Sequence, residues 1–152
     1  MRRELDSLLA DHPFLQELPG RYHALLAACA RNVRFPAEGY LMREGAPADC
    51  FYLLRRGRVA IEVHRPDGAA IGIQTIDGGD ILGWSWLIPP YRWRFDARAL
   101  DHVTAFVLDG ACLREKCERD HELGYELLKR FAGIVTRRLE ATRLQLLDLY
   151  GG

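Results

Sequence analysis

Residues 51–59 have the sequence FYLLRRGRV. Four consecutive apolar residues end at two arginines and Gly57, and the apolar pattern resumes at Val59. A short run of aromatic and branched residues bounded by a glycine is typical of a β-strand that leads into a turn. The stretch therefore predicts two strands, Cys50–Arg55 and Arg58–His64, joined by a turn at Gly57.

The same pattern of short apolar runs and turn residues extends on both sides of this stretch, over residues 33–108. Runs rich in Val, Ile, Phe and Tyr alternate with turn residues at a spacing of about ten residues, which is typical of an antiparallel sandwich or barrel. Asp67-Gly68 is the clearest hairpin turn, because both residues tolerate a positive φ. Further strands are expected at Ala70–Ile76, Trp93–Leu100 and Val103–Leu108, with shorter ones near residues 33–35 and 40–42.

Helical patterns flank this β-region. Residues 1–32 have apolar residues at helical spacing, with a break at His12-Pro13. Residues 111–149 show no strand pattern, and their apolar residues recur close to a heptad spacing. The sequence thus predicts one domain over residues 1–152, made of an N-terminal helical segment (1–32), a β-barrel (33–108) and C-terminal helices (111–149).

The segment from Gly78 to Ala99, GGDILGWSWLIPPYRWRFDARA, contains all three tryptophans. Its glycines predict a turn followed by about one turn of helix near Gly83, which Pro89-Pro90 ends. Backbone N–H groups at such a position bind phosphate, and nearby arginines complete an anion site. The pattern therefore indicates a phosphate-binding loop with arginines at 92, 94 and 98.

Three motifs are informative together: FPAEGYLMREG at residues 35–45, FYLLRRGRV at 51–59 and GDILG at 79–83. They resemble, in order, the first strands, a hairpin and the start of the phosphate-binding cassette of the cyclic nucleotide-binding domain in the catabolite-activator superfamily. The resemblance covers nearly the whole chain. It implies a mainly β fold, an eight-stranded jelly-roll barrel (double-stranded β-helix) with an N-terminal helical segment and a long C-terminal helix.

After its last glycine the cassette departs from the family's pattern. Members that bind a cyclic nucleotide usually have a glutamate that accepts the ribose 2′-hydroxyl, where this chain has Trp84. The family's phosphate-pairing arginine falls on Trp93 when the apolar alternation of the next strand sets the phase, and on Arg94 when residues are simply counted. We prefer the strand phase, because a one-residue slip would turn Arg98 into the core.

Tryptophans are thus expected at both positions where the family has its polar ligand contacts, the glutamate and the arginine. Loss of both costs about two to four decades of affinity, which disfavours standard binding of cAMP or cGMP. Two alternatives stay open: a reshaped pocket in which tryptophans stack on a flat ligand, and a pocket that the tryptophans fill. The cofactor is accordingly expected to be none, a cyclic nucleotide or a related small ligand. The residues expected to contact a ligand are Gly83, Trp84, Ser85, Trp86, Arg92, Trp93 and Arg94.

The favoured hypothesis is a stand-alone regulatory or sensor domain that binds a nucleotide-like or other flat ligand in the barrel and signals through the C-terminal helix to a protein partner. The alternative is a degenerate, ligand-free protein-interaction module. DNA binding is not expected, because the family's transcription factors continue into a helix-turn-helix and this chain ends at Gly152. A homodimer is expected through the long helix, at Leu128, Phe131, Val135, Leu139 and Leu146.

Composition narrows the class further. The 152 residues are 49% hydrophobic, and 21 basic residues balance 21 acidic ones, so overall charge gives little attraction to nucleic acid. The four cysteines, at 29, 50, 112 and 117, fit no CxxC spacing and are expected to be free thiols. No histidine pair, catalytic motif or bilayer-length apolar run is found. We therefore expect a soluble cytoplasmic protein that is not an enzyme, holds no metal and does not contact a membrane.

Overall fold

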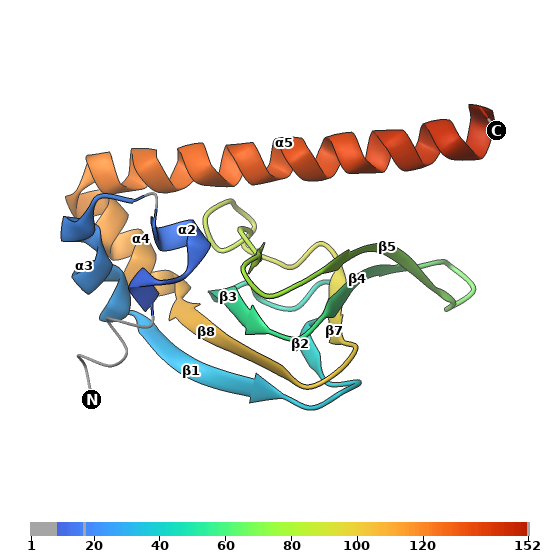
Figure 1. Cartoon of the computed structure of the whole chain (residues 1–152), viewed down its shortest axis with the longest axis horizontal. Coiled ribbons are helices and arrows are strands. Elements are labelled where there is room, and N and C mark those ends of the chain that lie inside the picture. Colours follow the sequence, from blue (N-terminus) through green and yellow to red (C-terminus); the bar gives the residue numbers. More distant parts are fainter. Residues whose placement is uncertain (1–8, 17, 152) are drawn as a thin grey trace.

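Two four-stranded sheets and a set of flanking helices make up the fold (Figure 1). A computed structural model describes residues 9–16 and 18–151. The strands are β1 (Ala30–Phe35), β2 (Tyr40–Met42), β3 (Cys50–Arg56), β4 (Val59–His64), β5 (Ala70–Ile76), β6 (Ile81–Leu82), β7 (Asp96–Ala99) and β8 (Val103–Asp109). The helices are α2 (Pro13–Gln16), the 3-10 helix η1 (Gly20–Tyr22), α3 (His23–Ala27), α4 (Gly110–Arg119) and α5 (His121–Gly151). The predicted eight-stranded jelly roll with a long C-terminal helix is confirmed.

The strands pair antiparallel throughout. One sheet has the order β1-β8-β3-β6 and the other the order β2-β7-β4-β5. The hairpin predicted at Asp67-Gly68 is confirmed, since β4 and β5 pair from Val59 opposite Ile76 to His64 opposite Ala70. The hairpin implied for FYLLRRGRV is wrong. Strands β3 and β4 lie where they were predicted, but β8 and β6 occupy both edges of β3, so β4 pairs in the other sheet.

The two faces of the first sheet bury two different apolar clusters. Successive side chains of a strand point to opposite faces. Phe51 and Leu53 of β3 therefore pack toward the helices, in what we call the outer cluster, together with residues of α2, α3, α4 and α5. Tyr52 and Leu54 of the same strand face the inside of the barrel and belong to the inner cluster. Any ligand inside the barrel would have to contact the inner cluster.

Several predicted boundaries move. Strand β1 begins at Ala30 and not near residue 33, because all six of its residues pair with β8, from Ala30 opposite Leu108 to Phe35 opposite Val103. The N-terminal helical segment therefore ends before residue 30, and its residues 1–8 lie outside the described part of the chain. Strand β7 is shorter than predicted and begins at Asp96.

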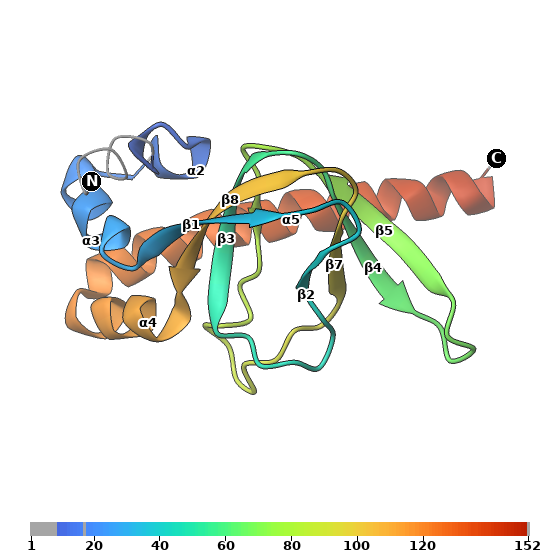
Figure 2. The ribbon, with the colours of Figure 1, turned by 90° about the horizontal axis from the view of Figure 1, so that it is seen from below.

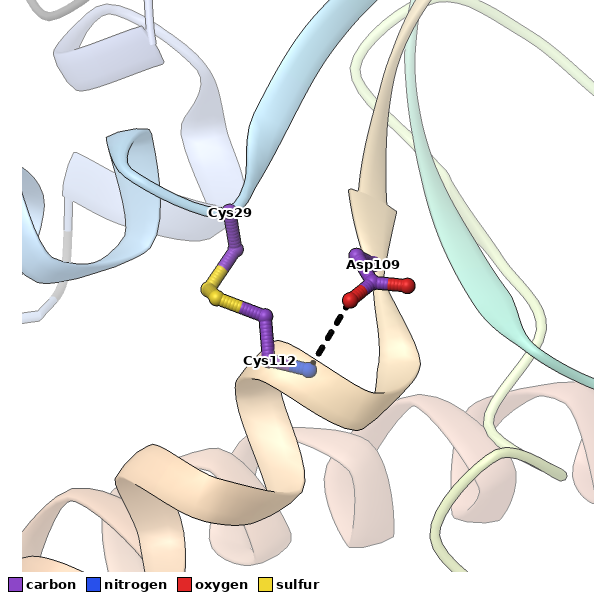
Figure 3. Close-up of a disulfide and its surroundings, with 3 residues drawn as sticks. All are labelled: Cys29, Asp109 and Cys112. Atoms are coloured by element: carbon purple, nitrogen blue, oxygen red, sulfur yellow. Dashed lines mark hydrogen bonds between the residues drawn. A yellow bond between two sulfur atoms is a disulfide. The ribbon is translucent and has the colours of Figure 1, made fainter.

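A disulfide joins Cys29 and Cys112, so the prediction of free thiols is wrong for these two residues (Figure 3). Their separation of 83 residues in the chain gives no sequence signal, and only the fold brings them together. The Asp109 side chain accepts a hydrogen bond from the Cys112 N–H and caps α4, while the Asp109 N–H donates to the Cys29 carbonyl. Cys50 and Cys117 are free, as predicted.

Helix α5 begins beside α4, and its later turns run along one side of the barrel (Figures 1 and 2). Its first turns are anchored in the outer cluster by Leu123, Leu127 and Phe131, which are all nearly fully buried. Its later turns expose large apolar residues to solvent, among them Leu139 and Leu146. The helix therefore has a buried anchor and an uncovered apolar face.

Candidate functional site

The site predicted from the sequence is the segment from Gly83 to Arg94, which connects β6 to β7. The predicted helical turn is wrong: the segment is a series of turns, with hydrogen bonds from Leu87 N–H to the Trp84 carbonyl and from Ile88 N–H to the Ser85 carbonyl. Pro89 and Pro90 have no N–H to continue a helical ladder. Without a helix, this loop lacks the aligned N–H groups that a helix start offers to phosphate.

Trp93 lies inside the barrel, directly against Gly83. Its side chain is 5% exposed and packs in the inner cluster. A Cβ atom placed on Gly83 would lie 2.7 Å from Trp93 Cζ3 and 3.1 Å from Met42 Cε, and Gly83 has φ of +91°. Hydrogen bonds between the Trp93 backbone and residues 45 and 46 hold the ring in place. An indole ring therefore occupies the space next to the glycine that opens the cassette.

The neighbouring side chains support the strand phase used to place Trp93. Ala97 and Ala99 follow Trp93 by an even number of residues, so the strand phase puts them on the same face. Both are fully buried in the inner cluster. Arg98 points the other way and pairs with Glu62 through two hydrogen bonds of 3.1 and 3.0 Å. Hydrogen bonding to Glu62 raises the pKa of Arg98. This arginine is committed to the outer face of the sheet.

Arg92 and Arg94, the other predicted anion-binding residues, are exposed. The Arg92 guanidinium donates to the Gly45 carbonyl at 2.9 Å, so it stabilises the loop at residues 45–48. Neither arginine is part of the inner cluster. The structure therefore does not bring the predicted arginines together with Trp93.

Trp84 and Trp86 lie on the other side of the sheet from Trp93. Trp86 is fully buried in the outer cluster, where it stacks at 6.1 Å from Phe51 and meets Phe131 edge-on at 6.0 Å. Trp84 is half-buried and packs against the same cluster, and Ser85 between them is also half-buried. Two tryptophans thus lie at the outer cluster and one in the inner cluster, and the three do not form one stacking surface.

Two arginines that the sequence reasoning missed tie this loop to the C-terminal helices. Arg114 of α4 donates to the Trp86 carbonyl and lies over the Tyr91 ring. Arg138 of α5 donates to the Ile81 carbonyl, just before the loop, and its guanidinium lies 5.3 Å from the centre of the Trp84 ring. A sequence signal existed for Arg138, which follows Leu127, Phe131 and Ile134 at helical spacing on the barrel-facing side.

Asp96, at the start of β7, anchors a second loop. It is 2% exposed, and its Oδ1 accepts from the Glu44 N–H at 2.7 Å. His64 Nδ1 lies 2.9 Å from its Oδ2, and Arg43 Nε lies 3.6 Å from Oδ1. These contacts hold the loop after β2 against the barrel. In the described residues, no group of three or more His, Cys, Asp or Glu side chains is placed to bind a metal ion.

The face predicted to form a dimer is only partly as expected. Leu128, Val135, Leu139 and Leu146 are 39–51% exposed on α5. Phe131 is 4% exposed and stacks with Phe14, so it belongs to the protein's own core and its assignment to a dimer contact is wrong. None of the helices in the described part of the chain has the length and apolar character needed to cross a bilayer.

A jelly-roll barrel, a GDILG cassette and a long helix packed against it define a regulatory β-barrel domain. Residues 32–120 match the family described as Cyclic nucleotide-binding domain. This match spans more than half of the chain, and the protein belongs to the cyclic nucleotide-binding domain family. Domains of this family are regulatory rather than catalytic.

Three relatives show the range of this family. The CRP-like cAMP-activated global transcriptional regulator of Mycobacterium tuberculosis is 27% identical over 145 residues, which are 95% of this chain and 63% of the relative. The chain therefore spans less than two thirds of that relative's length. A candidate cyclic nucleotide-binding protein from Geobacter metallireducens GS-15 has a TM-score of 0.78 and 28% identity, covering 88% of this chain and 97% of that chain.

The third relative is a mutant regulatory subunit of a cAMP-independent protein kinase A from Trypanosoma brucei, bound to cAMP in its A site. It has a TM-score of 0.74 and 21% identity, covering 95% of this chain and 51% of that chain. At this identity the similarity shows the fold alone. Family and relatives together support a regulatory domain of the cyclic nucleotide-binding type.

Proposed function

We propose that this chain is a regulatory domain in which its own Trp93 occupies the barrel interior beside Gly83, and that it does not take a cyclic nucleotide in the family's usual manner. The observation that supports this most directly is the contact between the Trp93 ring and Gly83, inside the inner cluster. Of the two hypotheses from the sequence, this geometry favours the interaction module over the barrel-bound flat ligand.

The energetics agree with this proposal. An arginine paired with a cyclic phosphate and a glutamate that accepts the 2′-hydroxyl each contribute about 1.5 to 3 kcal/mol. Replacing both with tryptophan removes about two to four decades of affinity. In addition, a ligand would have to displace a buried indole, which costs about 3–5 kcal/mol of packing when its contacts are lost. Together these terms bring a micromolar ligand into the millimolar range or beyond.

The fold is used with and without cAMP among the relatives. One relative is described as cAMP-activated, and another as part of a cAMP-independent kinase. A regulatory role for this chain is therefore compatible with loss of the nucleotide. This protein keeps direct contacts between the cassette and helices α4 and α5.

Two arginine contacts supply that connection. Arg114 joins α4 to the Trp86 carbonyl, and Arg138 joins α5 to the Ile81 carbonyl and the Trp84 ring. A shift of the cassette would therefore change the contacts of both helices at once. Such a shift alters the output only if a partner binds the two arrangements with different affinity.

We infer that the exposed apolar face of α5 binds the same helix of a second copy of this chain. Its exposed apolar residues Leu128, Val135, Leu139 and Leu146 are separated by steps of 7, 4 and 7 residues. This spacing is that of a heptad seam, which pairs two helices. A homodimer would cover this face, and the α4–α5 unit would carry the regulatory state to a further protein.

The test is a titration of the purified protein with cAMP and cGMP, monitored by tryptophan fluorescence and melting temperature. The proposal expects no change in either signal at concentrations up to about 1 mM. A saturable fluorescence change together with a rise in melting temperature at micromolar cAMP or cGMP would contradict it. A response to another flat nucleotide would favour the barrel-bound sensor instead.

A further inference from the structure

A cleft lies between α5, β5 and the turn that precedes β6, with a volume of about 640 Å³. Phe14, Ile81 and Ile134 form part of its wall, and all three pack in or against the outer cluster. Trp93 and the alanines of β7 do not line it. The cleft is therefore separate from the space that Trp93 occupies, and its use does not depend on the proposed function.

The lining of this cleft is strongly cationic. Helix α5 contributes Lys129, Arg130, Arg137 and Arg138, against the single acid Asp80. Glu126 neutralises part of this charge, because it pairs with Arg130 at 2.6 Å and lies 3.9 Å from Lys129. No ion pair within the described residues involves Arg137 or Arg138. A neutral protein thus has a local excess of positive charge in a concave site.

Arg138 is the most constrained of these cations. One guanidinium nitrogen, Nη2, donates to the Ile81 carbonyl, while Nη1 is buried and has no hydrogen-bond partner among the described residues. Burial lowers the pKa of Arg138, Asp80 counteracts this, and the positive charge of Arg137 adds to it. A buried charged donor without a partner is costly. An anionic oxygen in the cleft would offset the repulsion between the two arginines.

We propose that this cleft binds a small anion with two or more phosphate groups, held by Arg137 and Arg138. Two guanidinium groups on adjacent residues match a ligand with several phosphate oxygens better than a single monoanion. The volume falls within the range of small-molecule sites, about 300–1,000 Å³. Gln74 and Thr75 of β5 also line the cleft.

The concave shape favours a small molecule over a nucleic acid. Arg130 and Arg138 are partly buried in the wall of the cleft, whereas a duplex backbone contacts exposed cations on an open surface. The site also stays open in a dimer. Arg137 follows Leu128 by nine residues, which at about 100° per residue places it about 180° around α5 from the seam.

The experiment is calorimetric titration of the full chain with inorganic pyrophosphate and tripolyphosphate at low ionic strength, with sulfate as the reference anion. We expect saturable binding of the polyphosphates and at least about tenfold weaker binding of sulfate. Arg137→Gln and Arg138→Gln should each weaken polyphosphate binding by about tenfold or more. Arg143→Gln, an exposed arginine of α5 outside the cleft, is the matched control and should bind as the wild type does.

Three outcomes would overturn the proposal: no binding of either polyphosphate at about 1 mM, sulfate binding as tightly as they do, or an equal loss in Arg143→Gln and Arg137→Gln. The last result would indicate diffuse attraction to a basic helix. Arg137 is exposed, so its substitution leaves the fold intact even if Arg138→Gln unfolds.

Discussion

At Gly83 the backbone and the Trp93 ring are so close that no side chain fits between them. Gly83→Ala would place a Cβ atom 2.7 Å from Trp93 Cζ3, in a residue with φ of +91°. We expect a loss of about 2–4 kcal/mol in the free energy of unfolding, from backbone strain plus overpacking. Urea denaturation measures this loss.

Gly68→Ala is the control for the strain alone. Gly68 has nearly the same φ, +90°, and nothing lies within 4 Å of a Cβ atom placed there. Its substitution should cost only about 1–2 kcal/mol. If both variants lose the same free energy, the Trp93 ring is not in contact with Gly83, and the filled-barrel account fails at its central residue.

Cys50 is a second residue whose environment makes a measurable prediction. Burial raises the pKa of the Cys50 thiol to about 11. Since only the thiolate reacts with iodoacetamide, alkylation of Cys50 should accelerate about tenfold per pH unit from pH 7 to 10 and level off only near pH 11. Peptide mass spectrometry at several pH values measures the rate. A plateau near pH 9, the ordinary range of a thiol, would show that Cys50 is not buried.

At the scale of elements, the disulfide ties the end of α3 to the first turn of α4. The two cysteines are 83 residues apart in the chain. Closing a loop of this size in the unfolded chain contributes about 2–5 kcal/mol to the free energy of unfolding. Reduction with dithiothreitol should therefore lower the free energy of unfolding by about 2–5 kcal/mol. The melting temperature should fall as well. Cys29→Ser should abolish the effect of the reductant, and Cys117→Ser should preserve it.

The bond also bears on where the protein is found. Disulfides persist in oxidising compartments and are rare in the reducing cytosol. The cytoplasmic location expected from the sequence stays a prediction, and it is tested by trapping cysteines with an alkylating agent at lysis. Free thiols at Cys29 and Cys112 in freshly lysed cells would contradict a permanent structural bond.

Helix α5 offers a separate prediction for the dimer. Leu139 is 50% exposed at the middle of the seam and far from the buried anchor at Leu123 and Leu127. Leu139→Glu should convert the dimer into a monomer with little loss of the monomer's stability, because half of the Leu139 surface is exposed in the monomer and the residue is not part of the core. Sedimentation equilibrium measures the change. A wild-type protein that stays monomeric at high micromolar concentration would contradict the homodimer.

At the scale of the whole molecule, the sequence was informative where local patterns determine structure. Alternation along the strands placed Trp93 on the inner face, and the turn at Asp67-Gly68 joined β4 to β5. The family motifs supplied the barrel and the position of the cassette. These features depend on neighbours in the chain, so a single sequence is enough to predict them.

Contacts between distant segments could not be predicted in the same way. The Cys29–Cys112 bond and the Arg114 and Arg138 contacts with the cassette join residues that are 28 to 83 positions apart. Phe131 follows the seam spacing equally well, but packing with Phe14 and Phe51 turns it inward. The cations of α5 are visible in the sequence, but only the fold brings them against β5 and the turn before β6 to form a cleft.

The central claim is that the barrel does not bind cyclic nucleotides, because Trp93 occupies the space beside Gly83 and Trp84 stands where the family has its glutamate. Calorimetric titration with cAMP of the wild type and of a Trp84→Glu/Trp93→Arg variant, which restores both polar anchors, tests it most directly. We predict no measurable binding to the wild type at about 1 mM and an affinity at least about a hundredfold higher for the variant. A micromolar dissociation constant for the wild type would contradict the account.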